Sequence, residues 1–172
     1  MAAGNEKHWF VAFVTSCQER RVAEYLGRLG YECWVPIQKE IHKWSDRKKV
    51  VDRVVISGLV FVHSTEFERY QSLGKVPGLR GYLNSGEGPG HPGIVKDAEM
   101  EAFRTMVEKG NGTVTVTGEN FSPGDHVRII DGPLEGMECE MVSVGATRCI
   151  VVRLGALGTA RMDIDISTVR NL

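Results

Sequence analysis

The sequence has few cysteines, no long apolar run and almost no net charge. Its four cysteines include no Cys-x-x-Cys pair, so the usual spacing of a zinc site is missing and we expect reduced thiols. No stretch approaches the roughly twenty apolar residues that a membrane span needs, and residues 1–7 lack the apolar core of a signal peptide. We therefore expect a cytoplasmic protein that makes no membrane contact.

Catalytic patterns are absent as well. The five histidines are scattered, and no Ser/His/Asp set or metal-ligand spacing occurs. The Gly-rich stretch 84–93 does not join a strand to a helix as a phosphate-binding loop does. We expect no enzyme activity, no cofactor and no bound metal.

Charge is distributed unevenly along the 172 residues. Lys and Arg number 16 against 14 Asp and Glu in residues 1–109, but 5 against 8 in residues 110–172. The length fits two small domains, and the difference in charge indicates that they meet different partners. The net charge of −1 argues against a protein that coats nucleic acid by charge alone, so any such contact should be local.

Hydrophobic periodicity predicts an α+β fold whose first part is a sheet with helices packed on it. The polar and basic stretch 39–53 is expected to protrude as a hairpin that turns at residues 45–47. Helices are expected at 18–29 and 66–73 and from Asp97 onward, and strands at 9–14, 32–37, 54–63 and 79–83.

The last part of the chain is predicted to be a small β-barrel. Residues 110–120 are rich in Gly and Thr and are expected to form a flexible linker with a possible short edge strand. A small sheet can remove its edges only by closing on itself, so five short strands in this space favour a barrel. These strands are expected at 127–130, 137–144, 148–154, 159–164 and 167–170.

The segment from Phe121 to Gly136 carries the most informative turn chemistry. A strand is followed by Asp131-Gly132-Pro133, in which Gly can adopt a positive φ and Pro fixes its own φ. A KOW module opens in this way. Together with the Trp-led first strand, the Arg-rich helix and the later run Ser-Gly-Leu-Val-Phe-Val at 57–62, it makes nearly the whole chain resemble the NusG family of bacterial transcription elongation factors.

The resemblance implies a domain organisation and a function. An N-terminal NusG (NGN) domain would span 1–109, a linker 110–120, and a five-stranded, SH3-like KOW barrel 121–172. The protein would be a monomeric elongation or antitermination factor that clips onto RNA polymerase. The alternative left open is a ribosomal-type KOW protein that binds RNA, although such proteins are usually strongly basic and this barrel is net acidic.

An apolar set is the first candidate site. Taken singly, each of these residues fills the core as readily as it forms a surface. The resemblance implies that they line a depression which receives the clamp helices of the RNA polymerase β′ subunit. The set is Trp9, Ile56, Gly58, Leu59 and Phe61.

Two basic regions are candidates for DNA contact. The resemblance implies that one helix face touches the non-template strand of the transcription bubble, and an Arg beside an aromatic ring suits single-stranded DNA. The hairpin has six Lys and Arg against three Asp and Glu, which supports weak, salt-sensitive contact or only a solvated loop. The residues are Arg20, Arg21 and Tyr25 on the helix, and Lys43, Arg47 and Lys48 on the hairpin.

The loop 155–158 of the predicted barrel is the last candidate. By resemblance, Ala156 and Leu157 would contact the termination factor Rho or a small-subunit ribosomal protein; otherwise they form a plain hairpin turn. The family's usual Pro-Gly-Tyr is replaced by Ser57-Gly58-Leu59. With the short, acidic-poor N-terminus and the segment Leu-Gly-Thr-Ala-Arg-Met at 157–162, such departures make the chain resemble the specialised paralogues of the Bacteroides UpxY type, which regulate capsular polysaccharide operons by antitermination.

Overall fold

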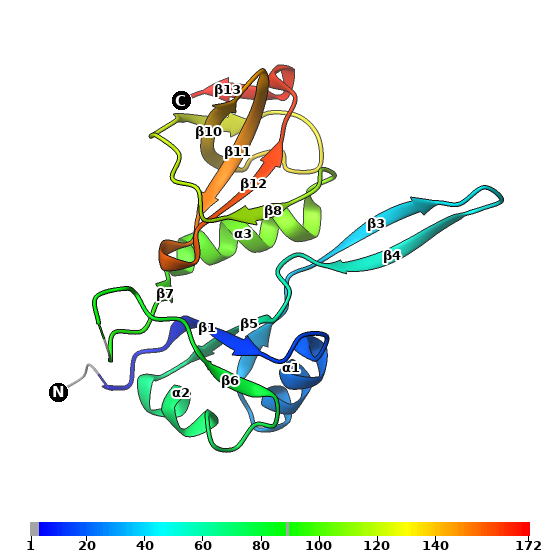
Figure 1. Cartoon of the computed structure of the whole chain (residues 1–172). Coiled ribbons are helices and arrows are strands. Elements are labelled where there is room, and N and C mark those ends of the chain that lie inside the picture. Colours follow the sequence, from blue (N-terminus) through cyan, green and yellow to red (C-terminus); the bar gives the residue numbers. More distant parts are fainter. Residues whose placement is uncertain (1–3, 89) are drawn as a thin grey trace. The chain divides into compact units, whose positions relative to one another are not determined.

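The computed structural model describes residues 4–88 and 90–172 of the chain (Figure 1). Contacts divide the chain into two compact units. The first contains the chain up to Val35, residues 56–100 and residues 154–158, and the second contains residues 36–55, 101–153 and 159–172. Each unit is built on an antiparallel sheet.

The sheet of the first unit has five strands in the order β2-β5-β1-β6, with β7 also paired to β1. Every pairing is antiparallel. The central strand β1 lies where the sequence predicted a strand, and it is apolar and largely buried along both faces. The strands are β1 (His8–Val14), β2 (Glu32–Trp34), β5 (Leu59–Ser64), β6 (Leu79–Tyr82) and β7 (Ile94–Val95).

Three helices follow the predicted pattern. Helix α1 (Glu19–Arg28) packs Val22 and Leu26 against the sheet residues Ala12, Val60 and Val62. A capping box opens α2 (Glu66–Ser72), because the side chain of N-cap Thr65 accepts from the Glu68 amide and the Glu68 carboxylate accepts from the Thr65 amide. Helix α3 spans Asp97–Lys109. The burial of α1 against the sheet fixes one face of the first unit.

The apolar run 54–63 is not the single strand that the sequence predicted. Strand β4 ends at Val54, and β5 begins only at Leu59. Between them Gly58 takes a φ of +76°, and its carbonyl accepts from the Val14 amide at 2.9 Å. A Cβ at Gly58 would lie 3.4 Å from the Val14 carbonyl oxygen, so glycine supplies both the turn and the close approach of β1.

The sheet of the second unit has six strands in the order β13-β9-β10-β11-β12-β8. The sequence predicted five strands here and a possible short edge strand within residues 110–120, and this sixth strand is β8, which pairs with β12. No pairing between the end strands β13 and β8 is present in the described part of the chain, so closure into a barrel stays a prediction. The strands are β8 (Thr115–Thr117), β9 (Asp125–Ile129), β10 (Glu138–Val144), β11 (Thr147–Arg153), β12 (Thr159–Asp163) and β13 (Val169–Asn171).

The segment expected to be a flexible linker is packed in the structure. Val114 is fully buried, and Gly110 and Gly112 lie against Met162 of β12. A Cβ at either glycine would come within 2.8 Å of the Met162 side chain. Here glycine permits close packing, where the composition alone suggested freedom of the backbone.

The basic stretch forms the predicted hairpin. Strands β3 (Ile37–Lys43) and β4 (Lys48–Val54) make a separate two-stranded sheet. The turn lies at Ser45 and Asp46, where the Trp44 amide donates to the Arg47 carbonyl at 2.7 Å. Figure 1 shows the two strands as a long ribbon without a third strand beside it.

Candidate functional site

Three of the predicted polymerase-contact residues lie together on one face of the first sheet. Antiparallel partners share a face, and Trp9 of β1 pairs with His63 of β5 while Val11 pairs with Phe61. Leu59 shares this face because it alternates with Phe61 and His63 along β5. The Trp9 ring stacks on the His63 ring at 4.8 Å between centroids. Trp9, Leu59 and Phe61 are all buried on the face opposite the one that α1 covers.

The exposed part of this face lies at Phe13. Its side chain is 40% exposed, and the residue pairs with Leu59 at the start of β5. Ile56 and Gly58 come just before that strand and are half-buried. The structure thus places the turn residues at the same end of β5 as Phe13, while the predicted residues on the strands are buried rather than open as a depression.

A buried carboxylate fastens this turn to the first helix. Oε1 of Glu19 accepts from the amide of Gly58 at 2.7 Å and from the amide of Cys17 at 3.3 Å. The Ser57 hydroxyl donates to the same oxygen at 3.5 Å. Burial raises the pKa of Glu19, but the hydrogen bonds led by the Gly58 amide outweigh it and hold the pKa below its usual value. Sequence reasoning missed Glu19, whose only local signal is an acid at a helix start.

The predicted DNA-contact residues of α1 lie on its outer surface. Arg20, Arg21 and Tyr25 are exposed. Arg21 and Tyr25 are four residues apart and therefore neighbours on one helix face, as the sequence predicted. Glu24 and Arg28 form an ion pair at 2.8 Å beside them. This face therefore presents a guanidinium and an aromatic ring to solvent.

The hairpin presents its basic residues at the tip. Lys43, Arg47 and Lys48 are exposed, and Lys43 pairs directly with Lys48 across the two strands. Like charges opposite each other destabilise a hairpin, so an anion bound between them would relieve this repulsion. The arrangement suits a phosphate backbone.

Apolar residues share this part of the hairpin. Ile41 and Val50 are cross-strand partners two pairs along the ladder from the two lysines and therefore on the same face, and both are exposed. Trp44 at the turn is exposed too. One face of the ribbon thus combines cations with apolar and aromatic side chains.

The residues predicted to contact a partner of the C-terminal domain lie in a single 3-10 turn, η2 (Gly155–Leu157). Ala156 is exposed, and Leu157 is half-buried. The Leu154 amide donates to the Gly158 carbonyl at 2.8 Å and closes the turn. Only part of the Leu157 side chain is accessible in this conformation.

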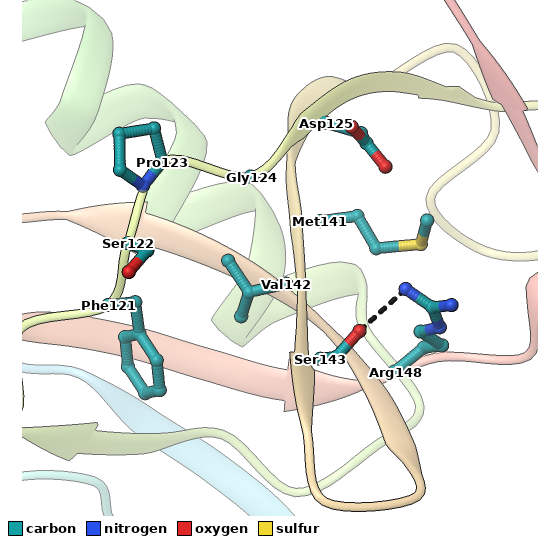
Figure 2. Close-up of a pocket in the computed structure, with 9 residues that line it drawn as sticks. All are labelled: Phe121, Ser122, Pro123, Gly124, Asp125, Met141, Val142, Ser143 and Arg148. Carbon is teal, nitrogen blue, oxygen red and sulfur yellow. Dashed lines mark hydrogen bonds between the residues drawn. The ribbon is translucent and has the colours of Figure 1, made fainter.

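A pocket of about 300 Å³ in the second unit was not anticipated from the sequence. Figure 2 shows the loop before β9 on one side of it and β10 on the other, with the Arg148 guanidinium donating to the Ser143 hydroxyl at 2.6 Å. The lining residues are Phe121, Ser122, Pro123, Gly124, Asp125, Met141, Val142, Ser143 and Arg148. The lining mixes apolar and polar groups, including one cation and one carboxylate.

Two kinds of site are not found in the described residues. Within 4–88 and 90–172, no group of three or more His, Cys, Asp and Glu side chains is placed to hold a metal ion. None of the helices described there is long and apolar enough to cross a membrane.

Comparisons with known proteins give the following matches. The family model described as "Transcription termination factor nusG" matches residues 7–104, more than half of the chain. No curated protein matches the sequence. The solved structure "Domain interaction in Thermotoga maritima NusG" matches with a TM-score of 0.52 at 23% identity, covering 97% of this chain and 98% of that one. The MjSpt4:Spt5 complex in conformation A matches with a TM-score of 0.32 at 17% identity, covering 95% and 97%.

Proposed function

Because the chain belongs to the NusG family, we propose that it is a transcription elongation or antitermination factor that binds RNA polymerase. The contact would be made to the β′ clamp helices at one face of the first sheet, where the buried Trp9, Leu59 and Phe61 support the accessible residues Phe13, Ile56 and Gly58. The observation that carries the proposal is the gathering of the strand residues on one sheet face, with the 57–58 turn at its end. An apolar face of this kind suits docking of helices.

The test uses the exposed residue of this face, because charges at buried positions would unfold the protein. Phe13→Asp should weaken binding to core RNA polymerase about 30-fold, as expected for a loss of about 2 kcal/mol at an apolar anchor. Phe67→Asp is the matched control, since Phe67 is 67% exposed on α2 and lies outside the proposed surface. Unchanged affinity of a folded Phe13→Asp variant would contradict the docking surface.

We assign contact with the non-template DNA strand to Arg21 and Tyr25, assisted by Arg20. The support is their exposure on one helix face and the affinity of single-stranded bases for aromatic rings. Replacing Arg21 and Tyr25 by Ala should abolish photocrosslinks to the bubble strand and leave polymerase binding intact. The matched control replaces Arg80 and Tyr70, another exposed Arg and Tyr. Crosslinks that persist at full yield would show that the helix face is wrongly assigned.

The hairpin tip is proposed as a second, non-specific DNA contact. Replacing Lys43, Arg47 and Lys48 by Ala removes three cations that face solvent. For single-stranded DNA each phosphate contact contributes roughly 0.7 to the slope of log affinity against log salt. Loss of all three contacts should therefore lower the magnitude of this slope by about 2. An unchanged salt slope would contradict DNA contact by the hairpin tip and would indicate that the hairpin is only a solvated loop.

The C-terminal part, proposed as a KOW domain over 121–172, would engage Rho or a small-subunit ribosomal protein through Ala156 and Leu157. Leu157→Asp in the full chain should weaken this binding, whereas Ala146→Asp, at an exposed turn of the same sheet, should not. The net acidic charge of residues 110–172 opposes RNA binding. Tight RNA binding that is insensitive to Leu157 would favour the ribosomal-type alternative.

A narrower role is proposed from the departure at Ser57 and Leu59. The missing Pro and Tyr support a specialised paralogue that serves surface-polysaccharide operons instead of all genes. Deletion of the gene should lower transcription at the distal ends of such operons only. A uniform effect on long transcripts would indicate a housekeeping factor.

A further inference from the structure

The base of the basic hairpin differs from the rest of it. Residues 41–50 are all exposed, but Gln38 near the start of β3 is only 6% exposed. Its cross-strand partner is Arg53 of β4, so the two side chains lie on the same face of the ribbon. A buried amide costs free energy unless its donor and its acceptor both find partners.

Both partners are backbone groups of the segment between α3 and β8. Nε2 of Gln38 donates to the Gly112 carbonyl at 2.6 Å, and the Val114 amide donates to Oε1 of Gln38 at 2.9 Å. Arg53 donates to the Val114 carbonyl at 2.7 Å and to Oε1 of Gln38 at 3.1 Å. The side-chain amide of Gln38 thus donates to one backbone carbonyl and accepts from one backbone amide, as a peptide group of a neighbouring strand would.

Arg53 is also held by a carboxylate. It forms an ion pair with Glu40, two residues along β3 from Gln38. The Val114 side chain beneath these contacts is fully buried. Arg53 is therefore engaged within the fold, and the cations of the hairpin that remain for a ligand are concentrated toward the tip.

We propose that Gln38 and Arg53 are positioning residues that clamp the hairpin base to residues 112–114, so that the hairpin is a stiff extension instead of a mobile arm. An isolated two-stranded hairpin is marginally stable in water, and such a clamp supplies the tertiary support that it needs. The consequence for DNA contact by Lys43, Arg47 and Lys48 rests on the proposed function; the clamp itself does not.

The first test measures hydrogen exchange in the full chain. Gln38→Met keeps the length of the side chain but removes its donor and acceptor, so exchange of the Val114 amide should accelerate roughly tenfold or more. Gln38→Glu keeps the acceptor and should retain most of that protection. Gln71→Met, at an exposed position on α2, is the control. Equal Val114 exchange in the wild type and a folded Gln38→Met variant would overturn the proposal.

A second measurement needs no variant, so a failure of Gln38→Met to fold leaves the proposal testable. Backbone order parameters from NMR relaxation of the wild-type chain should be near 0.85 along residues 37–43, the value typical of rigid backbone. Values below about 0.6 from the hairpin base onward would show a mobile arm and refute the clamp.

The third test separates the clamp from the proposed DNA contact. With a photocrosslinker at Lys48, the otherwise wild-type chain should crosslink to a short range (window) of nucleotides in the bubble strand. Adding Gln38→Met should lengthen this range while the total crosslinking yield stays similar. An unchanged window would refute the positioning role. If the wild type gives no crosslinks while the exchange and relaxation results hold, the DNA assignment fails and the clamp stands.

Discussion

The hydrogen bonds of Glu19 lead to a quantitative prediction for stability. Hydrogen bonds to a charged group contribute about 1.5–3 kcal/mol each. The bond from the Gly58 amide, at 2.7 Å, is well formed, whereas those from Cys17 and Ser57, at 3.3 and 3.5 Å, are long. Because Glu19→Ala also leaves the Gly58 amide without its partner, we expect the free energy of unfolding to fall by about 2–4 kcal/mol.

Urea denaturation followed by circular dichroism measures this change. Glu19→Gln retains one oxygen acceptor but loses the charge, so we expect it to cost about 1 kcal/mol. Glu24→Gln on the exposed side of the same helix is the matched control, and it should change stability by less than about 0.5 kcal/mol. The slope of unfolding free energy against urea concentration should be the same in all variants.

The pH dependence supplies an independent check. The folded-state pKa of Glu19 is lowered. The contribution of its carboxylate to the free energy of unfolding is therefore fully present above the ordinary pKa of a glutamate, and it is lost as the pH falls through the lowered pKa. The difference between the wild type and Glu19→Gln should therefore shrink in acid. A folded Glu19→Ala variant as stable as the wild type at pH 7, with the same pH profile, would refute this account of the turn.

Two further predictions concern the second unit and the thiols. Gly124→Ala should destabilise the protein by about 2 kcal/mol or more in thermal denaturation, because a Cβ there would lie 2.1 Å from the Met141 carbonyl oxygen; wild-type stability would refute this packing. In alkylation at pH 8, exposed Cys17 should react well before Cys139, since burial raises the pKa of the Cys139 thiol to about 11. Equal rates, measured by mass spectrometry, would contradict that burial.

The sequence predicted the elements that have a clear pattern. Helix α1 was recognised because its apolar residues recur at helical spacing, and strand β1 because residues 9–14 form a short continuous apolar run. The hairpin was recognised from its polar composition and turn residues. The run 54–63 was predicted as one strand, but the turn at residues 55–58, where Gly58 has a positive φ, divides it.

Contacts between distant parts of the chain were out of reach of pattern reasoning. No local sequence pattern predicts that Glu19 hydrogen-bonds to Gly58 or that Gln38 hydrogen-bonds to Val114, because each contact depends on how the elements pack. The same limit explains why residues 110–120 were predicted to be a linker: their glycines resemble a flexible spacer until Met162 is found against them. For the candidate site, the sequence supplied the residue types, and the structure supplied their burial.

The ribbon β3–β4 leaves a strand edge free on either side, since neither strand pairs with a third in the described residues. Such edges are templates on which a second copy of a chain can add and begin to aggregate. With six Lys and Arg against three Asp and Glu over residues 39–53, two copies of the ribbon repel each other in dilute salt. Salt near 1 M reduces the screening length to about 3 Å, so this repulsion between two ribbon edges should be largely lost at high ionic strength.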